Sequence, residues 1–298
     1  MNSPSFFRLL LLSAIWGASF LFMRIGAPVL GPSLLIFYRV GLAALFLLAI
    51  SFYHKQDLFL TQHWKHYLIL GLFNSAIPFL LFAYAAKTIS ASLLSILNAT
   101  APIWAAVIGA IWFKSQLTLK ILLGMVFGLI GVGFLAGVET LALPENGTIA
   151  IASGLAAAMS YGIATTYAKT AKSIAPFANA HGSMWGATLF LAPLTWISDP
   201  VMALPSVQIV FSVAILGIVC SGLAYLLYFR LISDVGATSA LTVTFLIPVF
   251  GILWGWLFLN ENVGPHTIIG GALVLMGTAQ VTNFSVRTLF ASPKTPTN

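Results

Sequence analysis

Polar side chains inside long apolar runs are the residues of this sequence that could do chemistry. Arg39 lies about two turns into such a run, where its guanidinium fork could hold a carboxylate or another anionic group. Alternatively, Arg39 reaches the lipid headgroups or caps helix carbonyls. Asn98 adds a buried amide that could bind an ammonium or carboxylate group. Arg24 lies closer to the end of its run, and we interpret it as a gate or headgroup residue. This chemistry is that of binding a small molecule.

Two prolines fall near the middle of apolar runs. Pro102 and Pro248 each remove a helical N–H and so free a carbonyl four residues earlier, at Asn98 and Thr244. The kinks could serve as hinges, and the freed carbonyls could accept hydrogen bonds from a substrate. The alternative is a packing kink that a nearby hydroxyl, such as that of Thr100, satisfies. We predict hinge or gate roles for both prolines and substrate contact for Asn98 and Thr244.

Aromatic residues inside the runs could line an apolar cavity, with a few polar groups to orient the ligand. Packing against other helices is the alternative for each of them. His181 could carry a proton or simply bond to a neighbouring helix. The predicted substrate-binding residues are Arg39, Asn98 and Thr244 together with Trp16, Tyr84, Trp104, Tyr161, His181, Trp185 and Tyr225.

Carboxylates, the usual elements of ion coupling, are confined to the expected loops. We therefore expect a carrier driven by the gradient of its substrate, without a coupling ion. No phosphate loop, metal-ligand cluster or nucleophile–base pair is recognisable, so we expect no cofactor, no metal and no enzymatic activity. The six acidic residues are Asp57, Glu139, Glu145, Asp199, Asp234 and Glu261.

The apolar runs that carry these residues require a membrane. Of the 298 residues, 60% are hydrophobic and only 6% are charged, whereas soluble domains carry about 25% charged residues. A membrane-spanning helix needs roughly 20 apolar residues, so ten spans would use almost the whole chain. The runs place these spans near 6–28, 32–53, 66–86, 90–112, 118–138, 147–168, 177–198, 206–229, 236–258 and 264–286.

The basic residues predict the orientation of the spans. If the N-terminus is inside, ten Lys and Arg residues fall in loops or span ends on that side, and only Lys87 falls in an opposite loop. This bias is typical of multi-span proteins, in which basic residues set the orientation. The net charge of +7 therefore does not indicate that the protein binds nucleic acid. We expect an inner (plasma) membrane protein with both termini cytoplasmic.

The sequence also repeats itself. Shifting it by 146 residues aligns Leu70–Gly131 with Leu216–Gly277 without a gap and superimposes Pro102 on Pro248. Five spans in each half is an odd number, so the second half enters the membrane the opposite way up. We therefore predict an all-α polytopic membrane protein of ten transmembrane helices, built as two inverted five-helix repeats at 1–142 and 143–298.

The sequence resembles the EamA family, the ten-helix branch of the drug/metabolite transporter superfamily. The resemblance covers nearly the whole chain. It includes an opening Ala14-x-Trp16-Gly17 and, in the second half, Pro248-Val249-Phe250 and Glu261. The family often has Gly-Glu after the fourth and ninth spans, whereas this chain has Lys114-Ser115 after the fourth, which puts a role for that loop in doubt. The other residues that carry the resemblance are Arg24, Pro32, Arg39, Ser90-Ala91-Ser92, Pro102 and Gly236-Ala237-Thr238.

The resemblance implies export of small metabolites through a cavity between two five-helix halves, and the sequence looks most similar to amino-acid exporters, including those for aromatic amino acids. We expect a monomer or weak homo-oligomer that exports or exchanges amino acids and related metabolites by alternating access. Exporters of drugs, nucleosides or other metabolites are the alternative, and an intramembrane enzyme or a channel is a more distant one.

Overall fold

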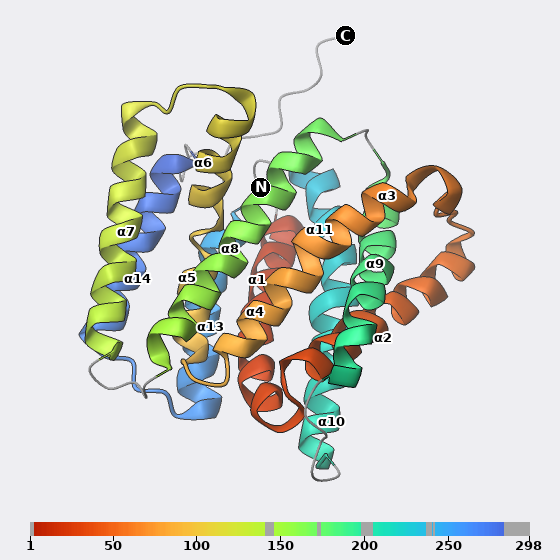
Figure 1. Cartoon of the computed structure of the whole chain (residues 1–298), viewed down its shortest axis with the longest axis horizontal. Helices are drawn as coiled ribbons and strands as arrows, with labels where there is room; N and C mark the ends of the chain where they lie inside the picture. The colour runs from red at the N-terminus through yellow and green to blue at the C-terminus, as the bar shows by residue number, and fades with distance from the viewer. Residues whose placement is uncertain are drawn as a thin grey trace.

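The computed structural model describes residues 3–140, 146–171, 174–197, 205–236, 240 and 242–282, with the side chains of 136–140 excepted. Within these ranges the chain forms ten helical segments (Figure 1). Six are long and apolar enough to cross a membrane, and Leu119–Leu135 and Val243–Leu259 are shorter apolar helices. The segments are α1 (Ser3–Leu30), α2 (Pro32–His54), α3–η1–α4 (Leu60–Ala85), α5 and α6 (Ala91–Asn98 and Ala101–Phe113), α7 (Leu119–Thr140), α8 (Gly147–Thr170), α9 (Pro176–Ile197), α10–η2–α11 (Val207–Val235), α13 (Val243–Leu259) and α14 (Pro265–Val281).

Two helices are shorter than the predicted spans, since α13 begins at Val243 and not at 236, and α14 ends at Val281 and not at 286. Two other segments are longer than predicted and differ in winding. The third begins at Leu60 and the eighth continues to Val235, about six residues beyond the expected limits of 66 and 229. Each contains a π-helical stretch, η1 (Gly71–Ala76) and η2 (Ile215–Leu223), and these overlap at the 146-residue offset. A π-helical stretch within a helix is rare and is frequently found at functional sites.

The fourth and ninth spans, although repeat-equivalent, are wound differently. The fourth breaks at Ala99 and Thr100, and Pro102 lies in the first turn of α6. Hydroxyl groups satisfy the carbonyls at the break: Thr100 Oγ1 donates to Leu97 O at 2.7 Å, and Thr278 Oγ1 donates to Ala99 O at 2.7 Å. In the ninth span, Pro248 lies inside the continuous helix α13.

The packing of helices is the same in both halves. The first helix of each repeat packs on the fourth span of the other repeat: α1 on α13, and α8 on α6. The second helix of each repeat packs on the π-helical stretch of the other: α2 on η2, and α9 on η1. α7 packs on α14, the last helix of one repeat against the last helix of the other, and the two stand side by side in Figure 1. The chain is therefore an all-α polytopic membrane protein built as two inverted five-helix repeats.

Glycines at equivalent positions bring these helices close together. A Cβ atom at Gly17 would lie 2.7 Å from the Cβ of Phe250, and one at Gly162 would lie 2.9 Å from the backbone of Trp104. Between α7 and α14, a Cβ at Gly124 would lie 2.6 Å from the carbonyl oxygen of Gly277. Because lipid tails give apolar helices no reason to associate, such close backbone packing is what holds the two repeats together.

We predict that Gly131→Ala destabilises the protein whereas Gly133→Ala does not. A Cβ at Gly131 would lie 2.8 Å from Gly270 O, so α7 and α14 must separate, at a cost of about 1–3 kcal/mol. A Cβ at Gly133, two residues further along the same helix, meets nothing within 4 Å. Thermal unfolding in detergent should show a lower midpoint for the first variant only. Equal midpoints would contradict the close approach of α7 and α14.

Candidate functional site

A cavity of about 300 Å³ lies between the two repeats. Helices of both halves form its wall, and apolar and aromatic side chains dominate it. A pocket of this size can enclose a small metabolite. The lining residues are Trp16, Ser19, Phe20, Met23, Arg39, Asn74, Phe79, Phe82, Asn98, Ala101, Tyr161, Thr165, Cys220, Tyr225, Tyr228, Val243, Thr244 and Ile247.

Most of the cavity wall is made twice, once by each repeat. Fourteen of the eighteen lining residues form seven pairs at repeat-equivalent positions, so the cavity lies on the axis that relates the two repeats. The offset is 145 for the first two pairs and 146 for the others. The pairs are Trp16 and Tyr161, Phe20 and Thr165, Asn74 and Cys220, Phe79 and Tyr225, Phe82 and Tyr228, Asn98 and Thr244, and Ala101 and Ile247.

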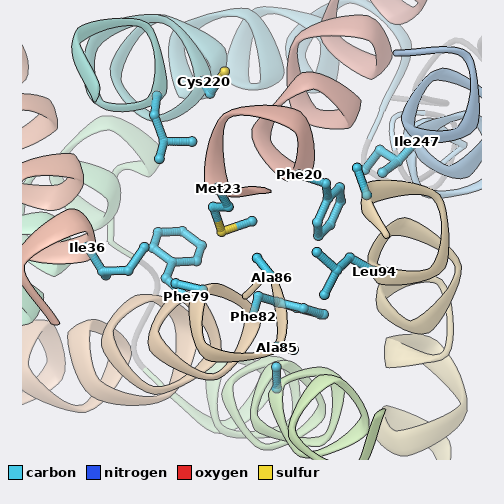
Figure 2. Packing of buried hydrophobic residues seen from close by; sticks show 14 of the residues in the cluster. Phe20, Met23, Ile36, Phe79, Phe82, Ala85, Ala86, Leu94, Cys220 and Ile247 are labelled. Carbon is cyan, nitrogen blue, oxygen red and sulfur yellow. The ribbon is translucent and has the colours of Figure 1, made fainter. Parts of the chain in front are cut away.

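The first repeat contributes three phenylalanines to the wall. Figure 2 shows Phe20 and Met23 of α1 with Phe79 and Phe82 of α4. The rings of Phe20 and Phe82 pack edge to face at 5.5 Å between centroids. The residues equivalent to the three phenylalanines, Thr165, Tyr225 and Tyr228, each carry a hydroxyl. At these three pairs the cavity therefore presents apolar rings from the first repeat and hydroxyl groups from the second.

Arg39 is the charged residue of this wall, and it is only 4% exposed. Its Nε donates to Ser221 Oγ at 2.9 Å, and Ser221 lies in the π-helical stretch η2. Its Nη1 lies 3.6 Å from Met23 Sδ, and its guanidinium carbon lies 3.6 Å over the Phe79 ring. Among the described side chains no carboxylate pairs with it, since the ion pairs there join Asp234 to Arg8 and Arg230. The remaining donors of Arg39 can therefore serve an anionic ligand.

The structure brings six of the ten predicted binding residues together. The other four do not line the cavity. Trp104 lies in α6 with its backbone against Gly162, and Tyr84 is 40% exposed on the outside of α4. His181 is fully buried in α9, where it accepts a hydrogen bond from Trp185 Nε1 at 3.0 Å. The six that line the cavity are Trp16, Arg39, Asn98, Tyr161, Tyr225 and Thr244.

The three predicted hinge or gate residues also lie outside the cavity wall. Arg24 holds the end of α4, because its Nη1 donates to the carbonyls of Ala86 at 2.7 Å and Lys87 at 2.9 Å. Pro102 begins α6 directly after the break in the fourth span, and Pro248 lies one residue after the cavity residue Ile247. Their roles as hinge or gate remain predictions.

Sequence reasoning missed Asn74 and the π-helical stretches. Asn74 lies in η1, lines the cavity and donates from Nδ2 to Tyr225 Oη at 3.3 Å. Its repeat partner is Cys220, which lines the cavity from η2. The signal available was an amide inside an apolar span, the same signal that pointed to Asn98. The winding itself has no comparable signal in the sequence.

The loop after the ninth span has a structural role. Glu261 Oε1 accepts from the N–H of Ala91 at 2.6 Å, and Oε2 accepts from the N–H and the hydroxyl of Ser92 at 3.0 and 2.6 Å. It thus caps the first turn of α5, a favourable position for a negative charge. The equivalent contact in the other half would join Ser115 to Ala237 and Thr238, which lie outside the described residues.

Other proteins are similar to this chain in sequence or in fold. The model of the EamA-like transporter family matches residues 5–137 and 148–283. An uncharacterized transporter of Archaeoglobus fulgidus is 28% identical over 93% of this chain and 96% of its own length. The uncharacterized transporter YoaV of Bacillus subtilis is 27% identical over 88% of this chain and 91% of its own. A solved crystal structure has the same fold, with a TM-score of 0.62 over 94% of this chain and 96% of the other, at 16% identity.

Proposed function

The chain belongs to the EamA-like transporter family, and we propose that it is a secondary carrier that exports or exchanges amino acids and related small metabolites by alternating access. The observation that carries this proposal is the cavity wall of seven repeat-equivalent pairs. Two inverted repeats around one site can adopt two nearly equal packings, one open to each side of the membrane. A ligand on their shared axis can remain bound while the repeats exchange these packings.

The cavity chemistry supports a ligand with a carboxylate and an apolar or aromatic body. Arg39 offers a charged donor, while Asn74, Asn98 and Thr244 offer neutral polar groups. Three phenylalanines, three tyrosines and Trp16 make up half of the remaining lining residues. An aromatic amino acid satisfies both requirements, with its carboxylate at Arg39 and its ring between the aromatic side chains.

Coupling to an ion is not part of the proposal. The described carboxylates lie away from the cavity: Asp234 pairs with arginines, Glu261 caps α5, and Asp57 accepts from the N–H of Phe59. His181 lies outside the cavity wall, where its Nε2 accepts a hydrogen bond from Trp185 Nε1. We propose transport along the substrate gradient, by a plasma-membrane protein with both termini in the cytoplasm. Reporter fusions at both ends should report the same side.

Counterflow in proteoliposomes tests the proposal. Liposomes loaded with unlabelled phenylalanine should transiently accumulate labelled phenylalanine, because a carrier exchanges one ligand for the other while a channel does not. Trp16→Ala removes a cavity wall residue and should lower counterflow about tenfold. Trp196→Ala, at a residue 91% exposed in α9, is the matched control and should leave counterflow unchanged.

Two results would contradict the proposal. Flux without counterflow and without saturation would indicate a channel. Saturable counterflow of nucleosides or cationic drugs, with none of amino acids, would favour the alternative class of exporter. Counterflow of the wild-type protein, measured with amino acids, nucleosides and cationic drugs, distinguishes an amino-acid carrier, a channel and the alternative class of exporter.

A further inference from the structure

The charge of the cavity wall comes from a lining residue that has no repeat-equivalent partner in the wall. Four lining residues have no repeat partner in the wall: Ser19, Met23, Arg39 and Val243. Arg39 is the charged one. Its counterpart can be identified from the packing, because a Cβ at Gly217 would lie 3.0 Å from Arg39 O and a Cβ at the equivalent Gly71 would lie 2.8 Å from Ser183 O. Where the first repeat places a cation, the second therefore places a neutral serine.

No described carboxylate balances this cation. Within the part of the chain that the structure describes, the cavity wall contains neither Asp nor Glu, and the contacts of Arg39 are to Ser221, Met23 and Phe79. A charge that is 4% exposed and has neutral neighbours is costly, and a bound anion offsets that cost. The described cavity wall by itself thus carries one net positive charge.

A bound zwitterion and a bound monoanion give such a cavity different net charges. The carboxylate of either ligand can pair with Arg39. An ammonium group then introduces a second cation, which this wall can meet only with neutral groups: the amides of Asn74 and Asn98, hydroxyl groups such as that of Thr244, and aromatic rings. A hydroxyl or keto group at the same carbon bonds to those residues without adding a charge. The bound monoanion leaves the site neutral, whereas the zwitterion leaves it positive.

We propose that this site selects monoanionic carboxylates with an aromatic or branched apolar body, the 2-hydroxy and 2-oxo acid counterparts of amino acids, over the zwitterionic amino acids themselves. The inference rests on the proposed carrier function and narrows its substrate class. Exchange of such an acid for an amino acid then moves one net negative charge across the membrane. That exchange is sensitive to membrane potential, whereas exchange of two amino acids is not.

A matched panel of ligands tests the preference. Phenylalanine, 3-phenyllactate and phenethylamine share one ring and differ only in charged groups. In competition against labelled phenylalanine counterflow, 3-phenyllactate should bind about tenfold more tightly than phenylalanine, and phenethylamine should not compete. With phenylalanine inside, an inside-positive potassium diffusion potential should accelerate 3-phenyllactate uptake. Protein-free liposomes measure and correct for passive entry of the protonated acid.

A variant that supplies the missing charge should reverse the order. Asn98→Asp places a carboxylate in the cavity wall, so phenylalanine should become the preferred ligand over 3-phenyllactate. Asn98→Leu, of similar size and without charge, should keep the wild-type order at lower affinity. Ligand-dependent thermal stabilisation in detergent gives the same ranking without a transport step, and it also shows whether each variant is folded.

The outcomes separate the two proposals. If phenylalanine is preferred in the wild type, or if potential has no effect on the mixed exchange, the charge selection is wrong while the carrier assignment stands. If none of the three compounds shows saturable counterflow or binding, the proposed function fails for aromatic cargo and the inference fails with it.

Discussion

Replacing Arg39 with glutamine should weaken binding of every carboxylate ligand about 30-fold, with little change for a ligand that has no carboxylate. The variant keeps a hydrogen-bonding side chain of reduced length but loses the charged donors that face the cavity. Hydrogen bonds to a charged partner contribute about 1.5–3 kcal/mol, and about 2 kcal/mol corresponds to this factor. The half-saturation concentration for counterflow of phenylalanine and 3-phenyllactate measures the effect.

Arg39→Lys is the matched variant. It keeps the positive charge but loses the planar fork that reaches Ser221 and covers the Phe79 ring, so its affinity should lie between those of wild type and Arg39→Gln. Removing an unpaired buried cation does not by itself destabilise a helix bundle, so the melting temperature of Arg39→Gln should be at least that of wild type. Unchanged affinity in the glutamine variant would show that Arg39 does not hold a substrate, and a lower melting temperature would show that its bond to Ser221 holds α2 and η2 together.

Replacing Glu261 with glutamine should lower the free energy of unfolding by about 3 kcal/mol. Its carboxylate accepts three hydrogen bonds from the first turn of the short helix α5. A neutral amide keeps one acceptor oxygen, loses the attraction to the helix N-terminus and presents an N–H₂ group to backbone donors. With the amide oxygen in the place of Oε2, the charge-assisted bond to Ala91 N is lost at about 1.5 kcal/mol or more, and the two bonds to Ser92 become neutral, each weaker by about 1 kcal/mol. Thermal unfolding in detergent, together with the yield of monodisperse protein, is the measurement.

Two controls accompany this variant. Asp57→Asn changes an exposed carboxylate that accepts one hydrogen bond, from Phe59 N at 3.0 Å, and should leave the melting temperature unchanged. Ser90→Ala removes the neutral cap of the same helix, whose hydroxyl accepts from Leu93 N at 3.0 Å, at a cost of about 1 kcal/mol. If Glu261→Gln melts with wild type, the loop after the ninth span does not anchor α5.

The positions of the helices were largely predictable. Span length follows from the thickness of the bilayer, so apolar runs place the crossings to within a few residues. The errors fall at the start of the third span and the end of the eighth, where the helices extend to Leu60 and Val235 beyond the apolar runs. They also fall at the ninth and tenth spans, where α13 begins at Val243 instead of 236 and α14 ends at Val281 instead of 286. His66 explains the error at the third span. Its ring nitrogens lie 3.1 Å from Tyr167 Oη and 2.9 Å from Asn179 Oδ1, so neighbouring helices hold this polar turn in helical form.

The candidate site was predictable only in part. Intramembrane polarity singled out Arg39 and Asn98, and repeat equivalence favoured Trp16 and Tyr161; all four line the cavity. The same signals also pointed to residues that do not line it, such as His181, which another residue of its own helix engages. The phenylalanines of the wall had no distinguishing mark, because the chain has 23 of them.

The sequence by itself determined the membrane class, the ten crossings and the inverted repeat. The thickness of the bilayer fixes the length of the apolar runs, and prolines and glycines that match at one offset identify the internal repeat. Only the tertiary structure decided which side chains converge on the axis. In a helix that is apolar all round, no periodicity marks the inward face, so its rotation depends on how closely its neighbours pack at residues such as Gly17 and Gly162. The π-helical stretches then contain the residues that face the cavity and Arg39, Asn74 in η1 and Ser221 in η2.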